Sequence, residues 1–334
     1  MTVGFFGGKF LPLHLGHMYA ILEASTQVDK LYVVLSSSKE EDKRLCVEDG
    51  IKYIPMEVRL SWIGEAINNL ENVEAIMIED YNWQAGSLKI VEAIPEKITH
   101  VFSSEKAYSK YFDMYYPWAK HVIIDNSRNT VNIRAMHIRS NIYQYWDMLP
   151  NVVKGFFVKR VAVVGTESVG KSTLVKKLAK FYNTNFVHEI GRDYCEKYSN
   201  KLTIDMFDKI VIEHYMLTEK LCETSNKVLF VDSEAITSAY YLKMYFNAKS
   251  RFIESIIEKQ HFDFWLYLEP DVKWVADGYR FLGDDKVRQE NNKFLMGLMM
   301  YYNEDIGNHQ IISGNYPERF KKARECVNSL ISSN

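Results

Sequence analysis

Two short stretches of this chain combine glycine with side chains that can bind phosphate. The first is GGKFLPLHLGH at residues 7–17, in which His14 and His17 stand three residues apart. The second is GTESVGKST at residues 165–173, in which a glycine-containing loop leads into Lys171. Glycine allows the backbone to turn sharply and approach a ligand closely, while imidazole, ammonium and hydroxyl groups donate hydrogen bonds to anions. Both stretches therefore predict sites that handle phosphate.

The first stretch lies between the apolar run TVGFF and a segment with the apolar spacing of a helix. Pro12 suits a turn just before helical dihedral angles begin, so His14 and His17 would share one face near a helix N-terminus. That end of a helix favours anions, and two imidazoles there could hold a phosphate as charge shifts in a transition state. The alternatives are a turn whose histidines face solvent, and a zinc site that would lack further ligands at motif spacing.

The second stretch is a complete G-x-x-x-x-G-K-S pattern, with the strand-like RVAVV before it and a helical pattern after it. In such a loop the backbone N–H groups cradle phosphates, Lys171 reaches the β and γ oxygens, and Ser172 holds Mg²⁺. A chance match on a structural turn is the alternative. The loop residues that we assign to ATP are Gly165, Thr166, Glu167, Ser168, Val169, Gly170, Ser172 and Thr173.

A phosphate loop also needs a carboxylate at the end of a neighbouring strand. Asp232 ends the apolar run of KVLFVDS at residues 227–233 and would act on the metal or its water shell. The alternative is a buried strand that simply ends in a surface aspartate. We therefore predict that Ser172 and Asp232 hold the metal.

Strands and helices alternate along both halves of the chain, which predicts parallel sheets with crossover helices. The first half has strand-like runs at 2–6, 30–38, 73–80, 98–104 and 121–126, and helical patterns at 15–27, 57–70 and 85–94. The second half has strand-like runs at 159–165, 227–233, 263–270 and 309–313, and helical patterns at 172–182, 204–223, from 285 and at the C-terminus. We expect an α/β protein of two domains, 1–150 with a Rossmann-like parallel sheet and 157–334 with a P-loop parallel sheet.

The composition points to a globular protein without a nucleic-acid or membrane partner. The 334 residues carry a formal net charge of −2 and no block of lysine and arginine. No signal-peptide pattern opens the chain, and no apolar run approaches the ~20 residues of a membrane span. The four cysteines form no Cys-x-x-Cys pair, which favours reduced thiols in the cytoplasm. We expect no nucleic-acid or membrane partner, and a homo-oligomer would be compatible with such sheets.

Residues 8–17 resemble the GxFxPxHxGH form of the signature of the adenylyl- and cytidylyltransferase superfamily. The resemblance implies that His14 and His17 stabilise the α-phosphate and the departing pyrophosphate, without a nucleophile from the protein. Chemistry of this kind depends on positioning and electrostatics, which fits the residue types found. The resemblance also implies nucleotide contacts by Gly8, Lys9 and Phe10, and by Ser104 in FSSE at 102–105.

The stretch IRAMHIRSN at residues 133–141 resembles the second motif of that superfamily, in which hydroxyl residues and an arginine touch the triphosphate. Arg139 falls on the family arginine, while Arg134 and Met136 stand where hydroxyl residues are expected. A guanidinium can fork onto two phosphate oxygens, so Arg134 could supply a substitute contact, whereas Met136 cannot. This departure keeps open a transferase half that only binds a nucleotide.

The continuation RSNIYQYWDMLP and several later segments resemble the bifunctional nicotinamide-nucleotide adenylyltransferase/ribosylnicotinamide kinases. In HEIGRDY, the resemblance implies that Glu189 and Arg192 hold the nucleoside. LEPDVKWVADGYRFLGDDKVR matches the lid of that family, where arginines neutralise the transferring phosphoryl group. The lid residues that we assign are Trp274, Asp277, Arg280 and Arg288, and IISGNYPERF adds Asn315 and Tyr316 near the adenine.

Two assignments keep alternatives. Trp62 and Trp83 are candidates to stack on a pyridinium ring, although a tryptophan in the core or on the surface is the alternative for each. The acid that takes the 5′-hydroxyl proton is Glu189, Asp232 or, less favourably placed, Asp193, and spacing does not decide between them.

The resemblance covers nearly the whole chain and implies two successive activities, with a nucleotidyltransferase domain at 1–150 and a kinase domain at 157–334. The kinase would phosphorylate nicotinamide riboside to the mononucleotide (NMN), and the transferase would adenylylate NMN to NAD, both with Mg-ATP. The alternatives are a kinase whose transferase half is a nucleotide sensor, a transferase for another phosphate ester such as a pantetheine phosphate, and a P-loop scaffold. Some members carry an N-terminal helix-turn-helix repressor domain, which we expect this chain to lack, so we expect no DNA binding.

Overall fold

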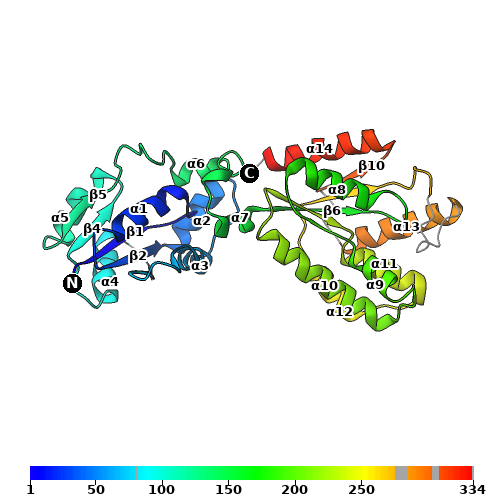
Figure 1. Ribbon diagram of the computed structural model, residues 1–334, viewed down its shortest axis with the longest axis horizontal. Helices are drawn as coiled ribbons and strands as arrows, with labels where there is room; N and C mark the ends of the chain where they lie inside the picture. Colours follow the sequence, from blue (N-terminus) through cyan, green and yellow to red (C-terminus); the bar gives the residue numbers. More distant parts are fainter. Residues whose placement is uncertain (80–81, 275–284, 303–307, 333–334) are drawn as a thin grey trace. The chain divides into compact units, whose positions relative to one another are not determined.

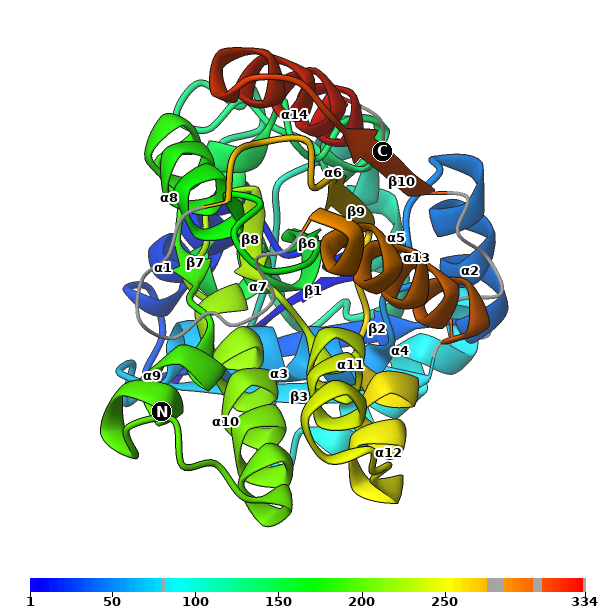
Figure 2. The same cartoon turned by 90° about the vertical axis from the view of Figure 1, so that its right-hand side faces the viewer.

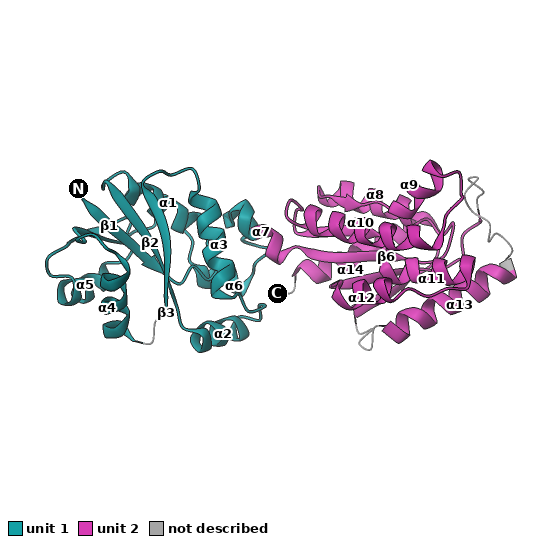
Figure 3. Ribbon diagram, turned by 90° about the horizontal axis from the view of Figure 1, so that it is seen from below, with its two compact units in different colours: residues 1–153, 334 teal, residues 154–333 magenta. Residues whose placement is uncertain are grey.

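The computed structural model describes residues 1–79, 82–274, 285–302 and 308–332. The chain divides into two compact units, Met1–Val153 and Lys154–Ser333, which Figure 3 colours separately. Each unit contains one five-stranded sheet in which all paired strands run parallel. The predicted α/β class with two parallel sheets is confirmed.

The sheet of the first unit has the strand order β3-β2-β1-β4-β5 (Figure 1). Its strands are β1 (Val3–Gly8), β2 (Lys30–Ser37), β3 (Val73–Glu79), β4 (His100–Ser103) and β5 (Lys120–Ile123). β1 and β2 are mostly buried, as expected for continuous apolar runs at the centre of a parallel sheet. The strand order reverses at β1, and ligands bind outside the carboxyl ends of the strands at such a switch point. The turn GGKFLPLHLGH begins at that end of β1.

Helices cover both faces of this sheet (Figure 3). Helices α1 (Leu15–Ser25) and α3 (Met56–Ile67) pack against β1, β2 and β3 on one face, while α4 (Trp83–Ala93) and α5 (Ser109–Tyr115) cover the other around Phe5 and Tyr116. The remaining helices are α2 (Lys39–Glu48), α6 (Ala135–Ser140) and α7 (Asn151–Phe157). The sequence did not indicate α2, because its only buried residues are Asp42 and Cys46 and it therefore has no apolar stripe.

The sheet of the second unit has the strand order β10-β9-β6-β8-β7. Its strands are β6 (Lys159–Val164), β7 (Phe186–Val187), β8 (Val228–Asp232), β9 (Phe264–Leu268) and β10 (His309–Ile312). β6 lies between β8 and β9, so this order also reverses at the strand that leads into the phosphate motif. The loop 165–170 and Asp232 therefore emerge at the same edge of the sheet.

Figure 2 shows helices on both faces of the second sheet. Alternate residues of β6 divide between two cores: Val161 and Val163 face α8 and α14, and Ala162 and Val164 face α10 to α13. The helices are α8 (Lys171–Tyr182), α9 (Ile190–Lys197), α10 (Ile204–Cys222), α11 (Ala235–Phe246), α12 (Arg251–Lys259), α13 (Asp285–Tyr302) and α14 (Tyr316–Ser332). Among the described helices, none is both long and apolar enough to cross a membrane.

Candidate active sites

In the first unit, His14 and His17 stack at the start of α1. His14 is the N-cap residue, and its Nδ1 accepts a hydrogen bond from the backbone N–H of His17 at 3.3 Å. The two rings lie 3.7 Å apart between centroids and 20° from parallel, and the ring of Phe10 meets His17 edge-on at 4.8 Å. The structure therefore brings together the two histidines of the motif at a helix N-terminus, where anions are favoured.

Both imidazoles are neutral near pH 7. Burial, helped by the positive charge of Arg128, lowers the pKa of His14 to about 3. Burial also lowers the pKa of His17, helped by repulsion from His14 when both rings are protonated and by the positive charge of Arg128. Because Nδ1 of His14 accepts a hydrogen bond, its proton lies on Nε2, and this N–H can donate to a phosphate oxygen.

The turn before His14 has an unusual backbone. Phe10 adopts a left-handed conformation with φ +46°, and the peptide bond between Leu11 and Pro12 is cis. Phe10 is buried, and its ring packs against the ring of His17. A Cβ at Gly16 would approach the ring of His14 to 3.0 Å, which explains the glycine at this position. Lys9 extends to Asp42, with Nζ 3.0 Å from Oδ1, and Gly8 ends β1.

The second motif of the first unit lies on α6. Arg139 is buried and donates from Nε to Asp49 at 2.6 Å and from Nη1 to the backbone oxygen of Leu11 at 2.8 Å. Arg134 is the N-cap residue of α6 and is exposed, and Met136 is 54% exposed.

Sequence reasoning missed Arg128, which contributes positive charge to both histidines. Its guanidinium donates to the backbone oxygen of Ile133 and to Glu105, each at 2.8 Å. The signal that could have found it is a basic residue just before IRAMHIRSN, the segment whose motif was recognised.

The structure separates the two candidate tryptophans. Trp62 is only 6% exposed and lies on α3 in the packed interior, whereas Trp83 is 55% exposed at the first turn of α4. The ring of Trp83 packs edge-on against Tyr111, with 4.6 Å between centroids. Ser104 is partly buried and directly follows β4, at the carboxyl edge of the sheet.

In the second unit, the loop 165–170 joins β6 to α8 with three residues at positive φ: Gly165, Ser168 and Gly170. A Cβ at Gly165 would lie 2.6 Å from the backbone oxygen of Leu268, so this position requires glycine. Lys171 is buried, and its Nζ donates to the backbone oxygens of Gly165 at 3.0 Å and Thr166 at 3.1 Å. The ammonium group therefore lies within the phosphate loop.

Asp232 ends β8 beside this loop. It is 2% exposed, and its Oδ1 is buried without a hydrogen-bond partner among the described residues. Burial and the negative charge of Glu189 raise the pKa of Asp232 to about 6, against the opposing effects of Lys171 and of a hydrogen bond from Ser172. An orphaned carboxylate oxygen next to a serine hydroxyl is a pair that suits a hard cation.

This pair fits Mg²⁺ better than it fits a metal held by protein alone. The described residues contain no group of three or more His, Cys, Asp and Glu side chains that could hold a metal ion. A magnesium ion in a phosphate loop takes one hydroxyl and one carboxylate, with phosphate oxygens and water completing the shell. Ser172 and Asp232 meet that requirement.

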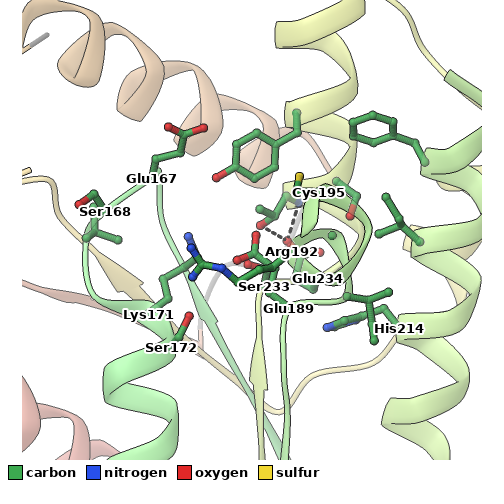
Figure 4. Close-up of a pocket in the computed structure, with 18 of the residues that line it drawn as sticks. Glu167, Ser168, Lys171, Ser172, Glu189, Arg192, Cys195, His214, Ser233 and Glu234 are labelled. Atoms are coloured by element: carbon green, nitrogen blue, oxygen red, sulfur yellow. Dashed lines mark hydrogen bonds between the residues drawn. The ribbon is translucent and has the colours of Figure 1, made fainter. Parts of the chain in front are cut away.

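A cavity of about 330 Å³ opens between the phosphate loop, α9, α10 and α11 (Figure 4). Glu167, Lys171 and Ser172 line one side and His214 the other, and the predicted Glu189 and Arg192 also line it (Figure 4). Residues that sequence reasoning did not assign also line it: Lys176, Cys195, Leu202, Phe207, Ile210, His214, Ser233, Glu234, Tyr241 and Tyr245. Some of them, such as Lys176 and Cys195, directly follow a recognised motif in sequence, whereas His214, Tyr241 and Tyr245 reach the cavity from α10 and α11.

Tyrosines and acids shape one side of this cavity. The hydroxyl of Tyr245 donates to Glu167 at 2.6 Å, and the rings of Tyr241 and Tyr245 stack 5.6 Å apart. Glu234 is the buried N-cap residue of α11 and accepts hydrogen bonds from the backbone N–H groups of Ile236 and Thr237. The cavity therefore combines aromatic faces with several carboxylates, which suits a cationic aromatic ring.

The segment 313–319 lies against the other side of the phosphate loop. Asn315 and Glu318 form a capping box at the start of α14, where each side chain accepts the backbone N–H of the other. The ring of Tyr316 lies close to Gly170 and is half-exposed. A second cavity, of about 400 Å³, is lined by Lys177, Lys180, Phe181, Tyr316, Pro317 and Phe320.

Arg319 ties this segment to the phosphate loop. Its guanidinium is buried and donates to the backbone oxygens of Val169 at 2.6 Å, Gly314 at 2.7 Å and Glu269 at 2.8 Å, and it pairs with Asp271. Sequence reasoning included Arg319 at the end of the segment near the adenine but gave it no role of its own.

Part of the predicted lid is described. Trp274 is partly buried, and Arg288 is buried on α13 with Nη2 3.0 Å from the backbone oxygen of Val272. The predicted Asp277 and Arg280 lie outside the described residues.

Comparisons with known proteins agree with this fold. A family model described as cytidylyltransferase-like matches residues 5–141, and one described as an AAA domain matches residues 160–319. Two crystal structures of NadR protein share the fold: one in complex with NR has a TM-score of 0.82, 22% identity and coverage of 99% of this chain and 96% of that one. The other, in complex with NAD and AMP-PNP, has a TM-score of 0.81, 21% identity and coverage of 100% and 97%.

The curated relatives are similar over the whole chain. The trifunctional NAD biosynthesis/regulator protein NadR of Escherichia coli (strain K12) is 31% identical, over 99% of this chain and 83% of that protein. The NadR protein of Salmonella typhimurium (strain LT2) is 30% identical with the same coverage. The predicted resemblance is therefore confirmed, and this chain belongs to the NadR family of NAD biosynthesis proteins.

Proposed function

We propose that this chain is a bifunctional enzyme of NAD biosynthesis, which phosphorylates nicotinamide riboside to NMN and adenylylates NMN to NAD. The observation that carries the proposal is the pairing, in one chain, of a phosphate loop beside an acceptor cavity with a pair of neutral histidines on a phosphate-binding turn. Membership of the NadR family supports it, as do the NR, NAD and AMP-PNP complexes of NadR proteins. The kinase step belongs to unit Lys154–Ser333 and the adenylyl transfer to unit Met1–Val153.

In the kinase step, the 5′-hydroxyl of the riboside attacks the γ-phosphorus of ATP, and ADP leaves. The loop N–H groups hold the phosphates, and Lys171 turns from its carbonyl partners to the β and γ oxygens. Glu189 lines the cavity and takes the hydroxyl proton, whereas Asp232 lies beside Ser172. Ser172 and Asp232 would hold Mg²⁺, which supplies positive charge to the β and γ oxygens when bound. Tyr316 and its neighbours would flank the adenine.

In the transferase step, a phosphate oxygen of NMN attacks the α-phosphorus of ATP, a P–O–P bond forms, and pyrophosphate leaves. The Nε2–H of His14 donates to the α-phosphate, and the charge of Arg128 lies close enough to both histidines to depress their pKa values. Arg128 thereby supplies positive charge near a motif in which Arg134 and Met136 replace hydroxyl residues. We propose that Trp83, the more exposed tryptophan, stacks on the pyridinium ring.

The test incubates the pure chain with Mg-ATP and either nicotinamide riboside or NMN, and resolves ADP, NMN, NAD and pyrophosphate by chromatography. NMN and ADP from the first substrate, and NAD and pyrophosphate from the second, would support both activities. NMN without NAD would mean that the first unit only senses a nucleotide. The absence of both NMN and NAD would refute the enzyme proposal. Repeating both reactions with EDTA tests the proposed requirement for Mg²⁺. Because both reactions consume ATP, we propose that the enzyme acts in the cytoplasm.

A further inference from the structure

Helix α2 and its C-cap residue supply two carboxylates that each hold an arginine of the first unit. Asp42 accepts from Nη2 of Arg59, which lies on α3, at 2.6 Å. Asp49, the C-cap residue of α2, accepts from Nε of Arg139, which lies on α6, at 2.6 Å. The two acids are seven residues apart, which is about two helical turns, so they lie on the same side of the helix.

Each arginine also holds one backbone oxygen of the phosphate-binding turn. Nη1 of Arg59 donates to the oxygen of Lys9 at 2.7 Å, and Nη1 of Arg139 donates to the oxygen of Leu11 at 2.8 Å. These two oxygens flank Phe10, the residue with φ +46°. A left-handed conformation at a residue with a side chain persists only when its surroundings hold it, and the two guanidinium groups do so from both sides.

The ion pair of Asp42 and Arg59 is fully buried, and both side chains are hydrogen-bonded. The side chains of Asp42 and Arg59 are 0% exposed, and Asp42 also accepts from the hydroxyl of Ser37 at 2.6 Å and from Nζ of Lys9 at 3.0 Å. Burial alone would raise the pKa of Asp42, but the hydrogen bond from Ser37 and the charges of Arg59 and Lys9 outweigh it and hold the pKa below its usual value. A satisfied network of this kind allows one geometry.

We propose that α2 positions the phosphate-binding turn for adenylyl transfer. In this proposal Asp42 and Asp49 orient the guanidinium groups of Arg59 and Arg139, and these hold the turn in the conformation that presents His14 to the α-phosphate. Asp42, Asp49 and Arg59 are positioning residues in this account, because they act on the reaction through the turn. The inference rests on the proposed adenylyl transfer in the first unit. The kinase half of the same chain contains none of these contacts and serves as an internal standard.

The test compares Asp49→Asn and Asp42→Asn with the wild type and with a control on the same helix. Both variants keep the shape of the side chain and remove its charge. We expect KM for ATP in NAD formation to rise and kcat/KM for ATP to fall at least tenfold, while KM for NMN stays within twofold of the wild-type value. Kinase activity on nicotinamide riboside should not change. The control is Glu48→Gln, whose carboxylate is 54% exposed and bonds only Arg44 among the described residues, and which should match the wild type.

Other outcomes separate this inference from simpler explanations. A purely structural role would reduce the folded fraction, and would lower kcat without raising KM for ATP. The side chain of Asp49 is 26% exposed and that of Arg139 only 9%. Because Asp49 is less buried than Asp42, Asp49→Asn tests the inference if Asp42→Asn fails to fold. Unchanged ATP kinetics in folded Asp49→Asn would overturn the inference. A wild-type chain that makes no NAD from NMN would instead remove the proposed function on which it rests.

Discussion

One imidazole combines a structural and a chemical role at the start of α1. His14 caps the helix through Nδ1 and offers its other nitrogen to a ligand. Asparagine is an equally good N-cap residue but cannot offer that distal N–H. We predict that His14→Asn keeps the stability of the first unit at pH 7 and lowers the rate of NAD formation by about 10²–10³, the usual cost of losing one donor to a developing charge. A melting curve and a rate of NAD formation from NMN check this, and a rate within threefold of wild type would contradict it.

The same histidine makes the first unit sensitive to acid. The pKa of His14 falls from its usual 6.5 to about 3 on folding, so the unfolded chain binds more protons than the folded one between these values. The stability that His14 contributes is therefore complete above pH 6.5 and is lost as the pH falls toward 3. Each unit of pKa corresponds to about 1.4 kcal/mol. We predict a shallower fall of the melting temperature between pH 6.5 and pH 4.5 in His14→Asn than in wild type, and equal slopes would count against the neutral imidazole.

We predict that Asp232 sets the acid limit of the proposed kinase. Its pKa is raised to about 6 by burial and then by Glu189, and its proposed role with Mg²⁺ needs the ionised form. We predict that kcat/KM for phosphorylation of nicotinamide riboside falls as the pH drops through about 6. Glu189→Gln removes a like charge, so the residual activity should have its acid limb at lower pH, with kcat down by about 10².

The control for that profile is Asp193→Asn. Asp193 bonds His188 on the surface and does not line the acceptor cavity. Its profile should therefore match the wild type. An acid limb that stays in place in Glu189→Gln would show that Asp232 does not limit the rate.

At the scale of elements, the sequence predicted every described strand except the two-residue β7, and the helices that follow the two glycine motifs, because these carry strong periodicity. The short helices α6 and α9, which carry Arg139 and Arg192, were not predicted. Strands such as β8, VLFVD, are wholly buried apolar runs. It did not predict α2, whose functional residue Asp42 is a buried carboxylate in the charged stretch KEEDKRLCVE. The partners of Asp42, Arg59 and Ser37, lie elsewhere in the sequence, and no local pattern marks such a contact. Helix α12 was missed although Ile253, Ile256 and Ile257 give it an apolar stripe.

The sequence also located most motif residues of the candidate sites but not the helices that close them. His14, Lys171 and Glu189 were identifiable because their motifs are local. Tyr241 and Tyr245 belong to α11, a helix that was not predicted, and they reach the cavity only through the fold. The order of strands within each sheet was likewise not readable from one sequence.

Arg319 shows how one side chain can hold three elements together. It donates to the phosphate loop at Val169, to Glu269 after β9 and to Gly314 before α14. We predict that Arg319→Met destabilises the second unit by about 3 kcal/mol, because it leaves buried carbonyl groups without a donor, and raises KM for ATP in the kinase step. Chemical denaturation and kinase kinetics measure these effects. Lys322→Met removes an exposed hydrogen bond to Ser313 and should change neither the stability nor KM for ATP. An equal loss of stability in both variants would contradict the proposed role of Arg319 in joining the three elements.

At the scale of the whole molecule, each unit contains the described motif residues of its own proposed reaction: His14 and Arg139 in the first, and Lys171, Ser172 and Asp232 in the second. Lys171→Met should therefore abolish formation of NMN and leave NAD synthesis from NMN intact, while His14→Asn should slow NAD synthesis by about 10²–10³ and leave formation of NMN intact. Lys171→Met alone should make no NAD from nicotinamide riboside, and His14→Asn alone should make it only at its residual transferase rate. A mixture of the two should convert nicotinamide riboside to NAD after a lag in which free NMN accumulates, because NMN made by one chain is the substrate of the other. Accumulation of NMN without NAD in the mixture would mean that Lys171→Met cannot use free NMN, and it would contradict the independence of the two units.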